Sequence, residues 1–162
     1  MGIPRRKERS FFEEEVGSSF IQACVKTIET YLSIAPLRVK HTMAYDLQVN
    51  YELGAYMRVV VDEKDVQLTI AFEKDFSISV YNKMLDEKKT QVNEDVLDCV
   101  SELTNIIYGL AKAQLVDKGH LFSSGRPVST TDLNSILKGR GSLEVKFCVD
   151  KKEPQFSLIF SL

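Results

Sequence analysis

The first half of the chain changes its hydrophobic period twice. From about Ser18, apolar residues recur at spacings of three and four, which predicts an amphipathic helix that must end before Pro36. Residues 37–49 then alternate loosely as one extended segment. Residues 56–61 and 66–72 are rich in β-forming side chains on either side of a charged tetrapeptide, so they predict a β-hairpin.

Helical spacing returns twice in the middle of the chain. Residues 76–85 predict a short helix, and a much longer helix is predicted from about Asn93 to Lys118. Gly119 is placed to stop the longer helix, because glycine readily adopts the left-handed conformation found after many helix ends.

The last third of the chain predicts mainly strands. Residues 120–140 contain several Ser, Gly and Pro and predict a loop-rich stretch with room for one short edge strand. Residues 143–149 and 155–162 alternate around a charged turn and predict a second hairpin. The order of helix, strands, two helices and strands predicts an α+β fold, with helices packed on a largely antiparallel sheet.

Composition narrows the class of protein. Hydrophobic residues make up 44% and charged residues 27% of the 162 positions, which is typical of one globular domain and too apolar for a disordered chain. The formal net charge of −2 provides no positive field for nucleic acid. Because no apolar run approaches the roughly 18 residues of a membrane helix and no signal peptide is apparent, a cytoplasmic protein is expected.

The chain begins with a segment of mixed charge. Residues 1–15 combine basic and acidic side chains around Phe11 and Phe12, which suits either a frayed N-terminal arm or the lead-in to the first helix. Residues 16–162 are expected to form a single domain.

The cysteines and histidines do not suggest a metal site. Cys24, Cys99 and Cys148 are widely spaced, odd in number and set in apolar runs, which favours reduced, buried thiols over a disulfide framework or a zinc site. His41 and His120 lack neighbours at metal-ligand spacing and are expected to be hydrogen-bonded or solvated.

One face of the long predicted helix carries an ordered polar line. With about 100° per residue and Asp98 at zero, Glu102, Asn105, Gly109 and Lys112 all fall within about 40° of Asp98. Glu102 and Asn105 are i and i+3 neighbours, so their side chains can reach one target together. The positions about 120° to 200° away are mostly apolar, and this face is expected to point at the sheet; they are Val96, Val100, Leu103, Ile107, Leu110 and Gln114.

Two residues of this line are poor helix formers at positions where Lys or Glu would be better. Asn105 has below-average propensity, and Gly109 costs about 1 kcal/mol relative to alanine. A glycine there leaves room for another protein surface to approach the helix backbone. The alternative is an ordinary solvated helix face, and a single Glu-x-x-Asn spacing does not exclude it.

Residues 94–113 resemble the signature helix of the CheC/CheX/FliY family of chemotaxis phosphatases. In that family the helix carries an acidic residue or serine, a glutamate four positions later, and an asparagine three positions after the glutamate. Asp98, Glu102 and Asn105 match all three positions.

The resemblance extends over most of the chain from Phe20. It is closest to CheX, whose members carry one signature helix, whereas CheC-type members carry two. In this sequence the only Glu-x-x-Asn pattern is at Glu102 and Asn105. The resemblance therefore implies a CheC-like fold with one site per subunit, formed by a CheX-like domain over residues 16–162.

The activity that the resemblance implies is hydrolysis of the aspartyl phosphate on phosphorylated CheY, the chemotaxis response regulator. In this interpretation Asn105 orients the attacking water and Glu102 pairs with the regulator's phosphate-site lysine. The regulator supplies Mg²⁺, and the chain needs no cofactor of its own. Asp98, Gly109 and Lys112 are expected to contact the partner. For Asp98, a solvated first-turn acid is an equally good interpretation, and for Lys112 a surface role is favoured.

Two other functions remain open. The chain is also compatible with a non-catalytic flagellar-switch or adaptor module that binds CheY, or with an unrelated scaffold whose polar helix face is only solvated. CheX members are similar in being homodimers. The strands Tyr56–Val61 and Leu143–Val149 are expected to be sheet edges, and either one or the other is expected to pair across a twofold axis.

Overall fold

The structure is a computed structural model that describes residues 15–162. The predicted arm at residues 1–15 lies outside the described residues, except for Glu15, which begins the first helix. In chain order the described elements are α2 (Glu15–Leu32), β1 (Leu37–Tyr45), β2 (Leu53–Val61), β3 (Lys64–Phe72), α3 (Lys74–Leu85), α4 (Glu94–Asp117), β4 (Phe122–Ser124), β5 (Val128–Thr130), α5 (Leu133–Leu137), β6 (Gly141–Cys148) and β7 (Phe156–Ser161).

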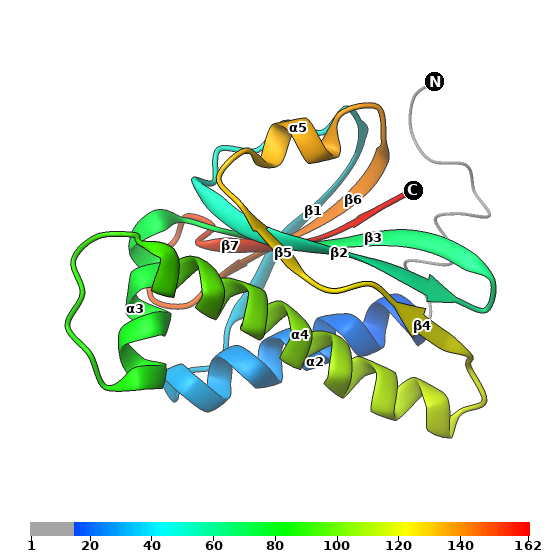
Figure 1. The fold of residues 1–162 in the computed structure, drawn as a ribbon, viewed down its shortest axis with the longest axis horizontal. Coiled ribbons are helices and arrows are strands. Elements are labelled where there is room, and N and C mark those ends of the chain that lie inside the picture. Colours follow the sequence, from blue (N-terminus) through cyan, green and yellow to red (C-terminus); the bar gives the residue numbers. More distant parts are fainter. Residues whose placement is uncertain (1–14) are drawn as a thin grey trace.

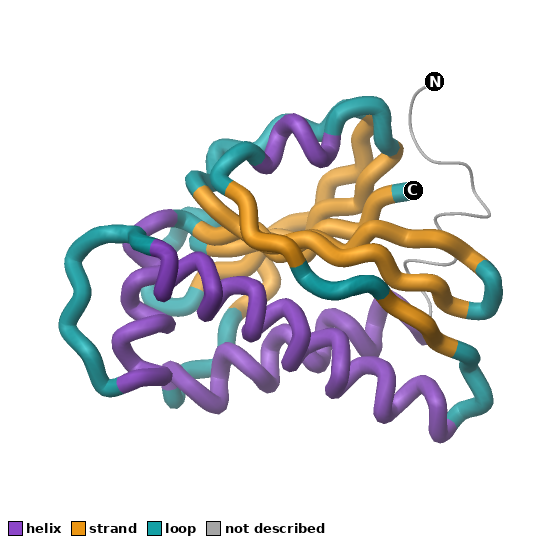
Figure 2. The backbone as a smooth tube through the Cα atoms, in the orientation of Figure 1, coloured by secondary structure: helices purple, strands orange, loops and turns teal. Residues whose placement is uncertain are grey.

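The strands form one antiparallel sheet in the order β1-β6-β7-β3-β2-β4, with β5 also paired to β2. Helices α2, α3 and α4 cover one face of this sheet, and the short α5 lies on the other (Figures 1 and 2). The predicted α+β class, with helices packed on a largely antiparallel sheet, is confirmed.

Alternation along the strands builds a core on each face. In β3, Leu68, Ile70 and Phe72 point into the large cluster under the three long helices. Ala71 points the other way, into a smaller cluster under α5. Because both faces of the central strands are covered, the sheet is a fixed platform for the helices.

The hairpin β2–β3 is confirmed, with a shorter turn than predicted. Only Asp62 and Glu63 lie in the turn, at φ 49° and 70°, while Lys64 already pairs with Val61. Positive φ at two consecutive turn residues matches the right-handed twist of a two-residue hairpin. Asp62 compensates for this rare conformation by accepting a hydrogen bond from the Leu121 backbone N–H at 2.9 Å.

The predicted sheet edges are wrong. Residues 143–149 fall largely in β6, which lies between β1 and β7. Residues 56–61 fall in β2, whose outer side is covered by β4 and β5. Each covering strand has only three residues, too short for an alternating pattern to show, and the predicted loop-rich stretch therefore holds two strands and α5.

The first helix reaches further toward the N-terminus than predicted, since the described part already includes Glu15, three residues before Ser18. It ends at Leu32, before Pro36 as predicted, and Ser33 adopts a left-handed φ of 60° there. Within residues 15–162, no helix has the length and apolarity needed to span a membrane. All three cysteines are free and buried, as expected.

Candidate active site

The helix that carries the polar line has the predicted limits. Helix α4 runs from Glu94 to Asp117, and the Asn93 side chain caps it by accepting a hydrogen bond from the Val96 N–H at 3.1 Å. After the C-cap at Lys118, Gly119 leaves the helical path at φ 94°. Both ends follow from local chemistry, a side-chain cap at Asn93 and a left-handed backbone at Gly119.

One side of α4 is buried against the rest of the fold. The helix packs on α2, α3, β2 and β5. Of the apolar positions predicted to face the sheet, Leu110 is only partly buried and Gln114 is exposed. The buried side of the helix instead extends to Tyr108, because its ring contacts Phe20 of α2 and Phe122 of β4. The buried residues are Val96, Cys99, Val100, Leu103, Thr104, Ile107, Tyr108, Ala111 and Leu115.

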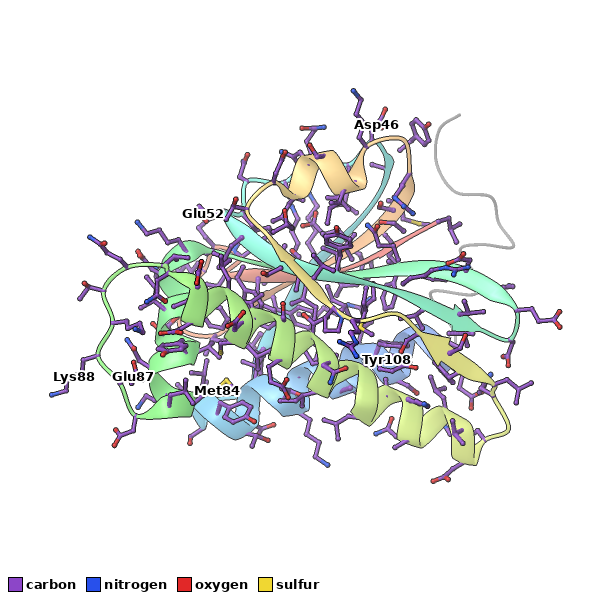
Figure 3. All side chains as sticks on the ribbon, in the orientation of Figure 1. Asp46, Glu52, Met84, Glu87, Lys88 and Tyr108 are labelled. Atoms are coloured by element: carbon purple, nitrogen blue, oxygen red, sulfur yellow. The ribbon has the colours of Figure 1, made fainter. Side chains whose placement is uncertain are left out.

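The opposite side of α4 is open, as predicted. Asp98, Glu102, Asn105, Gly109 and Lys112 are all exposed; we call these five residues the exposed line. Figure 3 shows the side chains of α4, the helix that carries them, and labels Tyr108 on it. Neither Glu102 nor Asn105 makes a side-chain hydrogen bond or ion pair with another described residue. The carboxylate and the amide, about 5–6 Å apart at Cβ as i and i+3 neighbours, are both free to meet a partner.

Asp98 stands beyond the first turn of α4, contrary to one interpretation of the sequence. The acids of the first turn are Glu94 and Asp95. The favourable effect of a helix N-terminus on a carboxylate falls off within that turn. The helix dipole is therefore a poor explanation for Asp98.

Lys112, at the basic end of the exposed line, makes an aromatic contact that the sequence did not predict. The Lys112 ammonium lies 5.9 Å from the centroid of the Tyr108 ring. Tyr108 is 6% exposed, and its hydroxyl is buried with no hydrogen-bond partner among residues 15–162. An aromatic residue four positions before a lysine is a sequence signal for this contact, but it is a weak one.

A buried thiol lies beside the exposed line. Burial raises the pKa of the Cys99 thiol to about 11, and the nearby Glu102 carboxylate adds to the rise. At neutral pH this cysteine is protonated and a poor nucleophile. The reactive potential of the site therefore lies in the exposed carboxylate and amide. No three His, Cys, Asp or Glu side chains in the described part of the chain are arranged to hold a metal ion.

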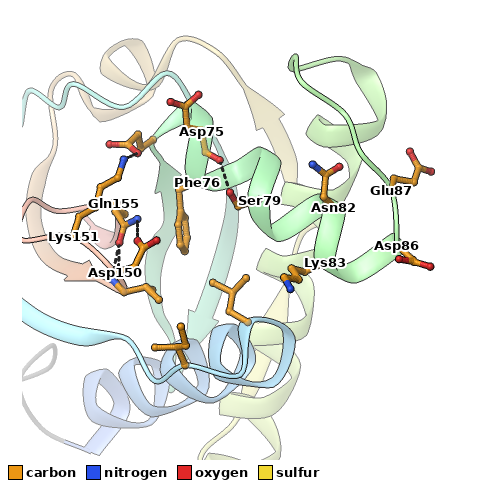
Figure 4. Close-up of a pocket in the computed structure, with 14 residues that line it drawn as sticks. Asp75, Phe76, Ser79, Asn82, Lys83, Asp86, Glu87, Asp150, Lys151 and Gln155 are labelled. Atoms are coloured by element: carbon orange, nitrogen blue, oxygen red, sulfur yellow. Dashed lines mark hydrogen bonds and ion pairs between the residues drawn. The ribbon is translucent and has the colours of Figure 1, made fainter.

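The exposed line lies on the open side of α4 and contributes no residue to two pockets of the described chain. A pocket of about 600 Å³ is lined by the end of α2, by α3 and by the β6–β7 turn, and contains no residue of the line (Figure 4). Its polar side chains are partly tied together, for example Gln155 to Asp150 at 2.6 Å. An exposed helix side of this kind suits a macromolecular substrate that has a pocket of its own for these side chains.

The sequence also matches a known family. A comparison with protein-family models matches residues 58–152 to the family described as "Chemotaxis phosphatase CheX". The matched segment includes the whole of α4. A comparison with curated proteins finds no significant match.

Three solved structures illustrate the fold. The CheC-like superfamily protein from Shewanella sp. PV-4 has a TM-score of 0.77 and 22% identity, over 91% of this chain and 96% of that chain. The chemotaxis protein CheX from Vibrio vulnificus has a TM-score of 0.77 and 20% identity, over 91% and 99%. The CheX-CheY-BeF₃-Mg²⁺ complex from Borrelia burgdorferi has a TM-score of 0.68 and 17% identity, over 90% and 96%. The chain thus has the CheC-like fold.

Proposed function

The chain belongs to the CheX family of chemotaxis phosphatases, and we propose that it hydrolyses the aspartyl phosphate of phosphorylated CheY. The observation that carries this proposal is the pair Glu102 and Asn105, exposed and unengaged on one side of a helix whose other side is firmly packed. The relative from Borrelia burgdorferi, solved as a complex with CheY, BeF₃ and Mg²⁺, supports CheY as the partner.

The role proposed for Asn105 follows from the chemistry of an acyl phosphate. This bond is already activated, and the regulator holds Mg²⁺ and a lysine around its phosphoryl group. The remaining requirement is a water molecule in line with the phosphorus. The carboxamide of Asn105 has both a donor and an acceptor, so it can hold that water without acting as a strong base.

The role proposed for Glu102 is docking. Its carboxylate lies one helical turn before Asn105 and has no ion-pair partner among the described residues. An ion pair with the regulator's phosphate-site lysine would fix where α4 sits over the phosphate. Asp98 extends the same acidic surface by one more turn and is proposed to contact the regulator beside it.

Gly109 is proposed to allow close approach. A Cβ built at this position meets no heavy atom of residues 15–162 within 4 Å, so nothing in the described part of the chain demands a glycine. A partner surface that rests on the α4 backbone would demand one.

We further propose that the chain forms a homodimer through β1. This strand pairs only with β6 in the described structure, so its other edge is free. Leu37 and Val39 on this strand are 65% and 46% exposed, which is unusual for apolar residues on a free edge.

Turnover separates a phosphatase from a CheY-binding module. Phosphorylated CheY is mixed with one-twentieth of its amount of this chain, and loss of the phosphoryl group is followed with time. A phosphatase dephosphorylates the whole population faster than CheY does alone. A binding module changes the fate of no more than one regulator per chain, and that result would favour the adaptor function.

A further inference from the structure

The charge along the exposed line of α4 changes sign from one end of the line to the other. Asp98, Asn105 and Lys112 follow one another at intervals of seven residues, so the acid and the base stand about 10 Å on either side of the amide. Glu102 adds a second negative charge on the side of Asp98. The line is therefore negative before Asn105 and positive after it.

Lys112 differs from the lysines that flank α4. Lys89 pairs with Asp95 at 3.3 Å, and Lys118 pairs with Glu15 at 3.2 Å. Lys112 makes no ion pair with a described residue, and its ammonium rests instead over the face of Tyr108. Among residues 15–162 its charge is thus unpaired and available to a partner protein.

The Tyr108 ring is a fixed support for that charge. It lies 6.5 Å from the Phe20 ring and 6.2 Å from the Phe122 ring, so α2 and β4 hold it from two sides. A lysine side chain is ordinarily flexible, and resting its ammonium on a buried aromatic face restricts where the charge can lie. The hydroxyl contributes no hydrogen bond to this arrangement, so the ring alone provides the support.

We propose that Lys112, seated on Tyr108, is a specificity-determining residue that selects a regulator carrying an acidic group beside its phosphorylation site. With Glu102 it sets the direction in which the regulator lies along α4. A regulator docked the opposite way round would bring its lysine to Lys112 and its acid to Glu102, and both contacts would be repulsive. This inference rests on the proposed function, since it assigns a partner feature to the same site.

The test is a comparison of kcat and KM for CheY dephosphorylation among charge variants. Lys112→Glu is expected to raise KM about tenfold and to leave kcat within about twofold, because a charge at the edge of an interface acts on docking. Lys112→Met is expected to have a smaller effect in the same direction, with a weaker dependence of KM on salt. Lys138→Glu makes the same change of charge beside α5, on the far face of the sheet, and is expected to behave as wild type.

Variants at Tyr108 test whether its ring positions the Lys112 ammonium. Tyr108→Leu is expected to raise KM as Lys112→Met does, because the ammonium loses its aromatic seat. Tyr108→Phe keeps the ring and is expected to restore the wild-type KM. Lys112→Arg keeps the charge and is expected to do the same. Should Tyr108→Leu fail to fold, the Lys112 variants still decide the question.

An unchanged KM for Lys112→Glu would overturn the inference, whether or not kcat falls. If the wild-type chain does not accelerate dephosphorylation, the proposed function fails separately. The dissociation constants of the same variants for CheY loaded with Mg²⁺ and BeF₃⁻ then decide whether Lys112 selects the partner, and equal values for wild type and Lys112→Glu would count against it.

Discussion

Gly109 follows Asn105 by one helical turn on the exposed line of α4, and a Cβ at Gly109 would meet no heavy atom of the described residues within 4 Å. Gly109→Ala is therefore expected to stabilise the free chain by about 1 kcal/mol, since alanine is the better helix former. The same methyl group is expected to obstruct a regulator resting on the helix, so KM for CheY rises. Urea unfolding and steady-state kinetics measure the two effects.

Gly54 provides the matched control for this substitution. A Cβ at Gly54 would clash with the backbone oxygen of Ile70 and would lie 2.8 Å from Leu133 Cδ2. Gly54→Ala is expected to lose about 1–3 kcal/mol of stability through overpacking. A Gly109→Ala protein that is more stable and keeps its wild-type KM would show that no partner approaches this backbone.

Glu102→Ala is expected to weaken the binding of phosphorylated CheY and to lower turnover with it. The carboxylate has no partner within the described chain, so its removal leaves no unpaired charge there and the effect reports on docking. The loss expected is about tenfold in affinity, the size of one interface charge pair. Affinity is measured by titration of CheY loaded with Mg²⁺ and BeF₃⁻. An affinity equal to wild type would contradict the role given to Glu102.

His120, which follows α4, links α2 to the β2–β3 turn through two contacts that depend on pH. Its Nε2 lies 2.7 Å from Glu15 Oε2 and its Nδ1 lies 2.5 Å from Asp62 Oδ2, so both carboxylates are served only by the protonated ring. Hydrogen bonds to Glu15 and Asp62 raise the pKa of His120 above its ordinary value of 6.5. The pKa values of Glu15 and Asp62 are lowered by the same contacts, and Lys118 adds to the effect on Glu15.

The pH dependence of stability follows from these directions. The stability contributed by His120 is fully present below pH 6.5 and is lost as pH rises through its higher folded-state pKa. The carboxylates contribute above their ordinary pKa values of 4.5 and 3.8, and their contribution is lost in more acidic solution. His120→Gln is therefore expected to lower the free energy of unfolding most between about pH 4.5 and 6.5. A loss that does not shrink at alkaline pH would contradict this account.

Because the proposed dimer forms through the free edge of β1, a charge placed on that edge is expected to disrupt it. Val39→Lys places a charge on that edge and is expected to give a monomer by light scattering. Val128→Lys alters a similarly exposed apolar residue on β5, away from β1, and is expected to leave the dimer intact. A wild-type chain that scatters as a monomer would reject the dimer, and a dimeric Val39→Lys would reject its proposed interface.

Local chemistry explains which parts of the fold the sequence predicted. The limits of α4 were predictable because an asparagine cap and a glycine stop act within a few residues of the helix end. The exposed line was predictable because helical periodicity alone places its five residues on one side. All five are exposed, as expected.

Long-range pairing explains what the sequence could not predict. β4 and β5 are defined by their register with β2, and three residues carry too little pattern to reveal it. The covering of β2 by these strands is also why the predicted edge was wrong. The position of Lys112 over the Tyr108 ring depends on Phe20 and Phe122, which contact that ring. These aromatic residues come from α2, α4 and β4, which are far apart in the sequence.

The kcat of Asn105→Ala at saturating amounts of phosphorylated CheY is the most direct measure of the central claim. The amide is proposed to place the attacking water, so the variant is expected to lose about a hundredfold in kcat for CheY dephosphorylation, a typical cost when a reacting group is misplaced. Its affinity for CheY loaded with Mg²⁺ and BeF₃⁻ is expected to stay within about threefold of wild type, since Glu102 still docks the regulator. Phosphate loss from CheY at the wild-type rate in the presence of Asn105→Ala would contradict the account.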